Sequence, residues 1–308
     1  MLNGMSFVKR LFVVGHHYID ITAKVKHIPL NDEKVLAQDR AISVGGNAVT
    51  AAFFAAKLGC ATELLCQLAD DDFGKIFLDR ARGYNIVLHP RRVRESSFSL
   101  ILPNNGKRAM IRSRDGEYLE DFPHLEVDGF HALHLDGHMA DAALHYARKF
   151  REQGILTSFD GGTFRPESTD TLLEFVDIAL VSELFCEQMN LAPISVLEYL
   201  QRKGCKIGGV TLGEKGVLWY NEYGNECRLP AFRVQPERIV DTNGAGDLFR
   251  GAMLNAKLNH PNWPWERALT YGAAAAAIGV QHLGNEASMS SESEIEMVVR
   301  TYPRAEAA

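Results

Sequence analysis

The order of strand-like and helix-like segments restricts the fold of this chain more than any other feature. From about residue 132 onward, short apolar runs typical of buried strands alternate with longer stretches of helical periodicity. The expected strands are 132–135, 156–159, 178–181 and 207–211, with helices at 140–153, 168–175 and 193–203. This order predicts right-handed crossovers and a parallel sheet with helices on both faces, which is the α/β class. Ligands of such sheets bind beyond the carboxyl ends of the strands.

The two ends of the chain follow a less regular order. The N-terminal part is expected to contain a strand at 11–14, extended segments at 16–28 and 35–44, an alanine-rich helix at 47–58, a strand at 62–68, a helix at 73–82 and a strand at 86–89. A hairpin with strands 97–102 and 108–113 is predicted around the turn Asn104-Asn105-Gly106. A second hairpin, 218–220 with 226–229, precedes helices at 246–258 and 265–280, which we expect to close the fold.

Composition narrows the class of protein further. A chain of 308 residues, 46% of them hydrophobic, is long enough to form one large α/β domain over residues 1–308. The net charge of −6 without a basic run argues against a nucleic-acid partner, and no apolar run reaches the roughly 18 residues of a membrane span. Five cysteines without a C-x-x-C pair are typical of reduced thiols. With no signal-peptide core in the polar N-terminus, we expect a cytoplasmic protein.

The segment 240–252 carries the strongest chemical signal. Gly244, Ala245 and Gly246 lie between a turn-forming Asp-Thr-Asn and Asp247, which opens an apolar helix. Unpaired backbone amides at a helix N-terminus attract anions, and a phosphate could rest on them. A carboxylate would repel that phosphate, so Asp247 is a candidate general base for a hydroxyl that attacks it. The alternative is an ordinary helix start, because Asp is favoured in the first helical turn.

This segment resembles the D-T-x-G-A-G-D signature of the PfkB (ribokinase-like) sugar kinases, with every fixed position filled. The resemblance extends from residue 10 to about residue 285. It implies a three-layer α/β/α fold with a mostly parallel central sheet, and a small β-sheet lid from segments near 16–44 and 97–114. It also implies that Asp247 deprotonates a primary hydroxyl of a sugar, which receives the γ-phosphate of ATP on the amides of the anion hole.

Two further segments resemble the sugar-binding motifs of that family. Gly45-Gly46-Asn47 follows an extended segment and opens the alanine-rich helix, where Asn47 could also serve as a helix cap. The resemblance instead implies that Gly46 and Asn47 contact the sugar. Asp20 follows Gly15 by five residues, and the aspartate at this spacing binds sugar hydroxyls in the family. The alternative for Asp20 is a solvated turn residue.

The nucleotide side is expected around residues 210–216. Val210-Thr211-Leu212-Gly213-Glu214-Lys215-Gly216 resembles the family motif v-T-x-G-x-x-G, although a strand followed by a turn would also explain it. The resemblance implies that the ATP contacts are Thr211, Gly213, Gly216, Thr242, Gly244 and Gly246. We expect an apolar adenine slot lined in part by the helix 271–278 and the loop 281–284.

Two carboxylates are expected to help bind metal ions, Glu183 for Mg²⁺ and Asp241 for a monovalent cation. ATP arrives as its Mg²⁺ complex, but the N-x-x-E motif of many relatives is replaced here by Ser182-Glu183-Leu184-Phe185. Glu183 is the candidate that remains for Mg²⁺. The resemblance also allows a monovalent cation such as K⁺ beside Asp241.

The substrate is expected to be a ketose or sugar acid with an anionic group. Short stretches such as Ser182-Glu183 resemble the branch of the family that contains sulfofructose kinase, and Lys34, Arg112 and His138 fall where an anion would be bound. A neutral sugar such as fructose is the alternative, with Lys34 and Arg112 as ordinary surface charges.

A nucleoside kinase would need an apolar pocket for the base, for which Phe98 is the candidate. A ligand sensor without activity is the second rival, and retention of Asp247 argues against it. Exposed lid strands predict a homodimer.

Overall fold

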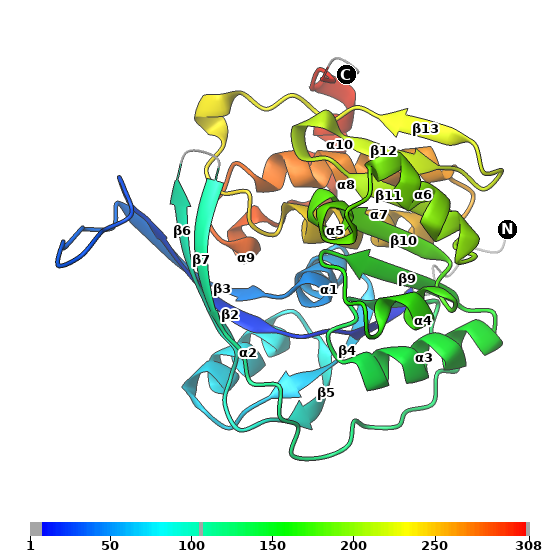
Figure 1. Cartoon of the computed structure of the whole chain (residues 1–308), viewed down its shortest axis with the longest axis horizontal. Helices are drawn as coiled ribbons and strands as arrows, with labels where there is room; N and C mark the ends of the chain where they lie inside the picture. Colours follow the sequence, from blue (N-terminus) through cyan, green and yellow to red (C-terminus); the bar gives the residue numbers. More distant parts are fainter. Residues whose placement is uncertain (1–7, 105–106, 306–308) are drawn as a thin grey trace, which may run out of the picture.

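The computed structural model describes residues 8–104 and 107–305, which form two sheets (Figure 1). The large sheet has the strand order β13-β12-β11-β10-β9-β8-β1-β4-β5, and all its neighbours are parallel except at β12 and β13. Its strands are β1 (Arg10–Val14), β4 (Ala61–Leu68), β5 (Val87–Arg92), β8 (Ala132–Leu135), β9 (Leu156–Gly161), β10 (Ile178–Ser182), β11 (Ile207–Thr211), β12 (Val217–Tyr220) and β13 (Glu226–Leu229). The predicted α/β class with a mostly parallel central sheet is confirmed.

Helices cover both faces of the large sheet. Successive strand residues point to opposite faces, so Leu11 and Val13 join one apolar cluster while Phe12 and Val14 join another. On the first face lie α1 (Asn47–Lys57), α2 (Asp72–Gly83), α7 (Ala245–Asn259), α8 (Trp265–Gly279) and α10 (Glu292–Thr301). On the second face lie α3 (Ala140–Glu152), α4 (Thr169–Leu173), α5 (Glu183–Met189) and α6 (Pro193–Arg202). The layers are therefore helix, sheet and helix.

The small sheet stands beside the large one (Figure 1). Its strand order is β3 (Asp39–Gly45), β2 (Tyr18–Lys24), β6 (Phe98–Asn104) and β7 (Lys107–Ser113), all within the two segments predicted for a lid. The loop 25–38 between β2 and β3 projects away from the body of the molecule. The tip of the predicted β6–β7 turn, residues 105–106, lies outside the described residues.

The two faces of the small sheet differ in polarity because its strands pair in a fixed register. Ser43, Asp20, Ser99 and Arg112 lie opposite one another across the four strands and share one face. One residue along, Ile42, Ile21, Leu100 and Ile111 form an apolar row on the other face. We call these sets the polar row and the apolar row. Ile42, Leu100 and Ile111 are exposed, at 51%, 39% and 67% of their surfaces.

Three short helices were not expected from the sequence. Helix α5 starts directly after β10, where the Ser182 hydroxyl accepts a hydrogen bond from the amide of Phe185 at 3.1 Å and so caps it. The short helix α9 (Asn285–Ser288) lies beside β3. Helix α10 follows the predicted last helix and begins with a capping box of Ser291 and Glu294. The prediction that the helices at 246–258 and 265–280 close the fold was therefore wrong.

Helix α7 packs against α1 and α8 at unusually short backbone distances. A Cβ atom on Gly251 would lie 2.7 Å from the carbonyl oxygen of Ala51 in α1. One on Gly272 of α8 would lie 2.5 Å from the carbonyl oxygen of Phe249 in α7. These glycines let the helices approach backbone to backbone, and so set the position of α7.

We therefore predict opposite effects for the same substitution at two helical glycines. Gly251→Ala should lower the free energy of unfolding by about 1–3 kcal/mol, because the added methyl forces α1 and α7 apart. Gly83→Ala in α2, where no atom lies within 4 Å of the new Cβ, should be neutral or stabilise by up to about 1 kcal/mol. Urea unfolding measures both. Equal stability of the two variants would contradict the close contact at Gly251.

Candidate active site

The candidate site is built around the N-terminus of α7. Gly244 is the N-cap and has a left-handed backbone with φ of 73°, which places the amides of the next residues at the open end of the helix. A side chain on Gly244 would clash with the Asn285 side chain, so the position requires glycine. Asp247 lies in the first turn and is half-buried. The predicted anion hole and its neighbouring carboxylate are thus both part of one helix terminus.

Asp20 lies in the polar row and is joined to this helix terminus. Its Oδ2 accepts hydrogen bonds from the side-chain amides of Asn243, at 3.0 Å, and of Asn285, at 3.3 Å. Burial raises the pKa of Asp20 despite these donors and the nearby Arg112. Asn285 also donates to the carbonyl of Val44 at 2.7 Å, which ties α9 to strand β3. Asp20 is therefore a buried, oriented carboxylate and not a solvated turn residue.

Gly46 and Asn47 form the start of α1. Gly46 is the N-cap with φ of 104°, and a Cβ there would clash with the carbonyl oxygen of His16. Asn47 is the first helical residue and makes no capping bond. Its side-chain amide donates instead to Oδ1 of Asp160 at 3.2 Å, so the interpretation of Asn47 as a helix cap was wrong.

A buried ion pair supports the same region. Asp160, at the carboxyl end of β9, lies 3.2 Å from Nε of Arg250, and neither side chain exposes more than 3% of its surface. Burial raises the pKa of Asp160, with Arg250 and Asn47 opposing the shift. The pKa of Asp247 lies well above its usual range, first because the carboxyl is desolvated and then because Asp160 repels its charge. A carboxylate with a raised pKa accepts a proton more readily, which suits a general base.

A second polar cluster lies beyond the ends of β1 and β8. Asp136 accepts hydrogen bonds from the amides of His16 and His138, at 3.2 and 3.0 Å. Although burial opposes it, the neighbouring His138, through its hydrogen bonds, and the Arg165 guanidinium hold the pKa of Asp136 below its usual range. His138 Nε2 lies 2.6 Å from Nη2 of Arg165, and its Nδ1 lies 3.1 Å from Asp136. His138 therefore orients Arg165, which was not singled out from the sequence.

Three guanidinium groups converge on Tyr18, which shares the face of Asp20. Burial raises the pKa of the Tyr18 phenol, while Arg114, Arg112 and Arg165 act to lower it. The Arg112 guanidinium lies 5.0 Å from the centre of the Tyr18 ring. Lys34 is exposed in the loop 25–38 and makes no hydrogen bond or ion pair with these groups among the described residues. The structure thus brings Arg112 and His138 together but not Lys34.

The predicted nucleotide residues lie in two places, at the carboxyl end of β11 and at the start of α7. The Thr211 hydroxyl donates to the carbonyl of Val181 at 3.2 Å, which joins the ends of β11 and β10. Gly213 is the first residue of the short helix η1 (Gly213–Lys215), and Gly216 follows its last residue. The two glycines have positive φ of 58° and 89°. A Cβ on Gly216 would clash with the carbonyl oxygen of Leu229. Thr242 accepts a hydrogen bond from Nη1 of Arg108 in β7 at 3.4 Å, so the small sheet touches the loop before α7.

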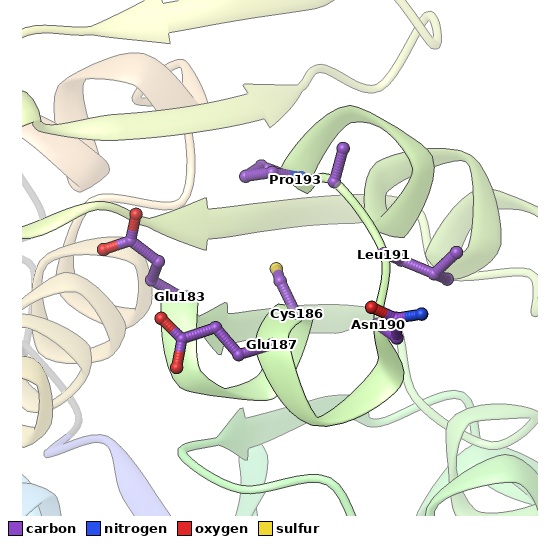
Figure 2. Close-up of a pocket in the computed structure, with 7 residues that line it drawn as sticks. Glu183, Cys186, Glu187, Asn190, Leu191 and Pro193 are labelled. Carbon is purple, nitrogen blue, oxygen red and sulfur yellow. The ribbon is translucent and has the colours of Figure 1, made fainter.

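The two predicted metal residues differ in their surroundings. Glu183 is exposed and lies with Glu187 on one side of α5, beside a hollow of about 310 Å³ (Figure 2). Within residues 8–104 and 107–305, no cluster of three or more His, Cys, Asp or Glu side chains could hold a metal. Asp241 is buried, and burial raises its pKa. Its Oδ1 accepts from the amide of Asn243 at 2.9 Å, while Oδ2 has no hydrogen-bond partner in the described structure.

Comparison with known proteins identifies the family. The model of the pfkB family carbohydrate kinases matches residues 8–292. The chain belongs to this family. It is therefore a carbohydrate kinase, as its signature predicted. The curated ribokinase of Mus musculus is 22% identical over 93% of this chain and 94% of its own length.

Solved structures agree on the fold. Ribokinase of Thermotoga maritima is 25% identical with a TM-score of 0.75, over 96% of this chain and 100% of its own. Ribokinase of Arabidopsis thaliana, complexed with ribose and ATP, is 22% identical with a TM-score of 0.74, over 96% and 100%. The predicted ribokinase-like fold is confirmed. In the described part of this carbohydrate kinase, every helix is too short or too polar to cross a lipid bilayer.

Proposed function

We propose that this carbohydrate kinase transfers the γ-phosphate of ATP to a primary hydroxyl of a ketose or sugar acid that carries an anionic group. The observation that carries the proposal is the hydrogen bond from Asn243 to Asp20, because it joins the predicted sugar site to the anion hole of α7. The hydroxyl oxygen attacks the γ-phosphorus, the bond to the ADP oxygen breaks, and Asp247 takes the hydroxyl proton. The amides of Gly244, Ala245 and Gly246 would stabilise the charge on the transferring group.

The polar row supports recognition of a polyol. The Asp20 carboxylate can accept hydrogen bonds from sugar hydroxyls, and the side-chain amide of Asn47 at the start of α1 can donate and accept them. The hydroxyl of Ser43 lies beside Asp20 and is buried without a hydrogen-bond partner among the described residues. A bound sugar would supply that partner.

The arginines around Tyr18 support recognition of an anionic group. Arg112, Arg114 and Arg165 place positive charge on the sugar-facing side of the small sheet. Arg165 is held by His138, so the predicted role of His138 becomes indirect in this proposal. Phe98, the candidate contact for a nucleoside base, alternates with Ser99 onto the opposite face and packs 5.7 Å from Phe73 between ring centres. The nucleoside alternative has correspondingly less support.

The proposed reaction would need Mg²⁺ because the ATP phosphates carry negative charge. Mg²⁺ would neutralise phosphate charge, held mainly by phosphates and water as this ion prefers, with Glu183 and Glu187 as nearby carboxylates. The unpartnered Oδ2 of buried Asp241 fits a monovalent cation such as K⁺. Thr211, Gly213, Gly216 and Thr242 would border the nucleotide.

The first prediction concerns turnover. Release of ADP should depend on a sugar from a panel of neutral, phosphorylated, sulfonated and acidic sugars and nucleosides. Asp247→Asn should lower kcat by about 10²- to 10⁴-fold, because the base is lost while the anion hole remains. Turnover is followed by coupled ADP assay and binding by calorimetry. Ligand binding without turnover in the unchanged protein would favour a sensor instead.

The second prediction concerns the anionic group. Arg112→Gln should raise KM about tenfold for an anionic sugar, through loss of a charged contact, and leave KM for a neutral sugar unchanged. Arg40→Gln is the matched control, since Arg40 is an exposed arginine of β3 on the outward face. Equal effects of Arg112→Gln on charged and neutral sugars would rule out an anion site at this residue.

We further propose that the protein is a homodimer in which the apolar row of the small sheet packs against its copy. This row leaves Ile42, Leu100 and Ile111 exposed together, and such patches mark interaction surfaces. The small sheets would then act as paired lids over the two sugar sites.

The third prediction tests this dimer. Ile42→Asp with Ile111→Asp should shift the protein from dimer to monomer in light scattering after gel filtration, because charges would be buried without partners. Met297→Asp on α10, a residue exposed to 54%, should leave the mass unchanged. A monomeric unchanged protein at every concentration would disprove the proposed interface.

A further inference from the structure

Neither Asp160 nor Arg250 was assigned a direct step in the phosphoryl transfer described above, although both are buried beside its base. Asp160 is the second-last residue of β9, and Arg250 lies one turn into α7 from Gly246. Their side chains expose 0% and 3% of their surfaces. A buried ion pair contributes little net stability, because desolvation of the two charges offsets their attraction. Its location beside the candidate reacting groups therefore calls for another explanation.

Each member of the pair contacts a different part of the site. Asp160 Oδ1 accepts the hydrogen bond of Asn47, the candidate sugar contact on α1. Arg250 donates from Nε and Nη2 to the carbonyl of Leu180 in β10, at 3.3 and 2.9 Å. Its Nη1 lies against the first turn of α7, since a Cβ on Gly246 would come within 2.7 Å of it. The pair thus connects α1, β9, β10 and the anion hole.

We propose that Asp160 and Arg250 are positioning residues for phosphoryl transfer, which hold Asn47 and the first turn of α7 in place and set the charge that Asp247 faces. The inference rests on the proposed role of Asp247 as the base. It assigns to the pair an effect on the proton transfer that a purely structural pair would not have.

The charges that act on Asp247 come from four elements. Asp160 on β9 and Asp20 on β2 repel its negative form, while Arg250 on α7 and Arg108 on β7 attract it. Asp136, directly after β8, adds repulsion at Asp160. Within this group, Asp160 and Arg250 act on the pKa of Asp247 in opposite directions. Removing one charge of the pair should therefore move the pH at which Asp247 becomes active.

The test is the pH profile of kcat/KM, whose acid limb reports the pKa of the base in the free enzyme. Asp160→Asn removes the repulsion but keeps an oxygen for Asn47. Its acid limb should move about one unit to lower pH, with sugar KM unchanged within about twofold. Asp160→Ala also removes the acceptor, and should raise sugar KM several-fold in addition. Arg250→Lys keeps the positive charge, so the acid limb of its kcat/KM profile should lie at the same pH as in the unchanged enzyme.

The double variant Asp160→Asn with Arg250→Gln gives the sharpest comparison. It keeps the pair neutral, so its acid limb should lie back toward that of the unchanged enzyme. Glu296→Gln, which breaks the exposed pair of Glu296 and Arg300, is the control and should move nothing. Circular dichroism and thermal unfolding identify the folded variants.

Two results would overturn the inference and are distinguishable. If Asp160→Asn lowers kcat equally at every pH in a folded enzyme that Asp247→Asn inactivates, the pair is only structural and the proposed function stands. If Asp247→Asn keeps full activity, Asp247 is not the base, and both proposals fail together.

Discussion

The close packing of α7 between α1 and α8 is the constraint on which the rest of the site depends. At Gly251 and Gly272, helix backbones meet where no Cβ could fit. These contacts fix the axial position of α7, and with it the place of its open N-terminus. Since the anion-binding amides, Asp247 and Arg250 all belong to this helix, one packing arrangement positions all of them. The glycines of α7 thus serve the site at two places, through the left-handed cap at Gly244 and the helix contact at Gly251.

The site also shows how two of its carboxylates come to have different proton affinities. Asp136 lies beside His138 and Arg165, and its pKa falls despite burial. Asp247 is desolvated and faces Asp160, and its pKa rises. A carboxylate with hydrogen-bond donors and a guanidinium nearby stays ionised and can organise backbone amides, as Asp136 does for His16 and His138. A carboxylate whose loss of hydration is only partly offset by nearby positive charge has a raised pKa and can exchange a proton during a reaction.

The small sheet combines two surfaces through strand periodicity alone. Adjacent residues of each strand point to opposite faces, so the polar row and the apolar row are one residue apart. The first faces the candidate sugar site, and the second is exposed. A change of register by one residue would exchange them, and both the proposed sugar site and the proposed dimer would be lost. Glu286 helps to hold the register in place, because both its carboxylate oxygens accept from the amide of Val44 in β3 at 3.1 Å.

The sequence by itself determined the features that depend on neighbours along the chain. The alternation of apolar runs and helical stretches specified the parallel sheet, and Gly244 to Asp247 specified a helix N-terminus with a carboxylate in its first turn. The short helix α5 escaped prediction because it follows β10 without an intervening loop, and its cap, Ser182, is the last residue of that strand. Only the tertiary structure decided which groups meet. Asn243 and Asn285 reach Asp20 across 223 and 265 residues, and Arg250 pairs with Asp160 from another element. An asparagine or arginine looks ordinary in sequence, because its partner is chosen by strand order and helix packing and not by chain neighbours.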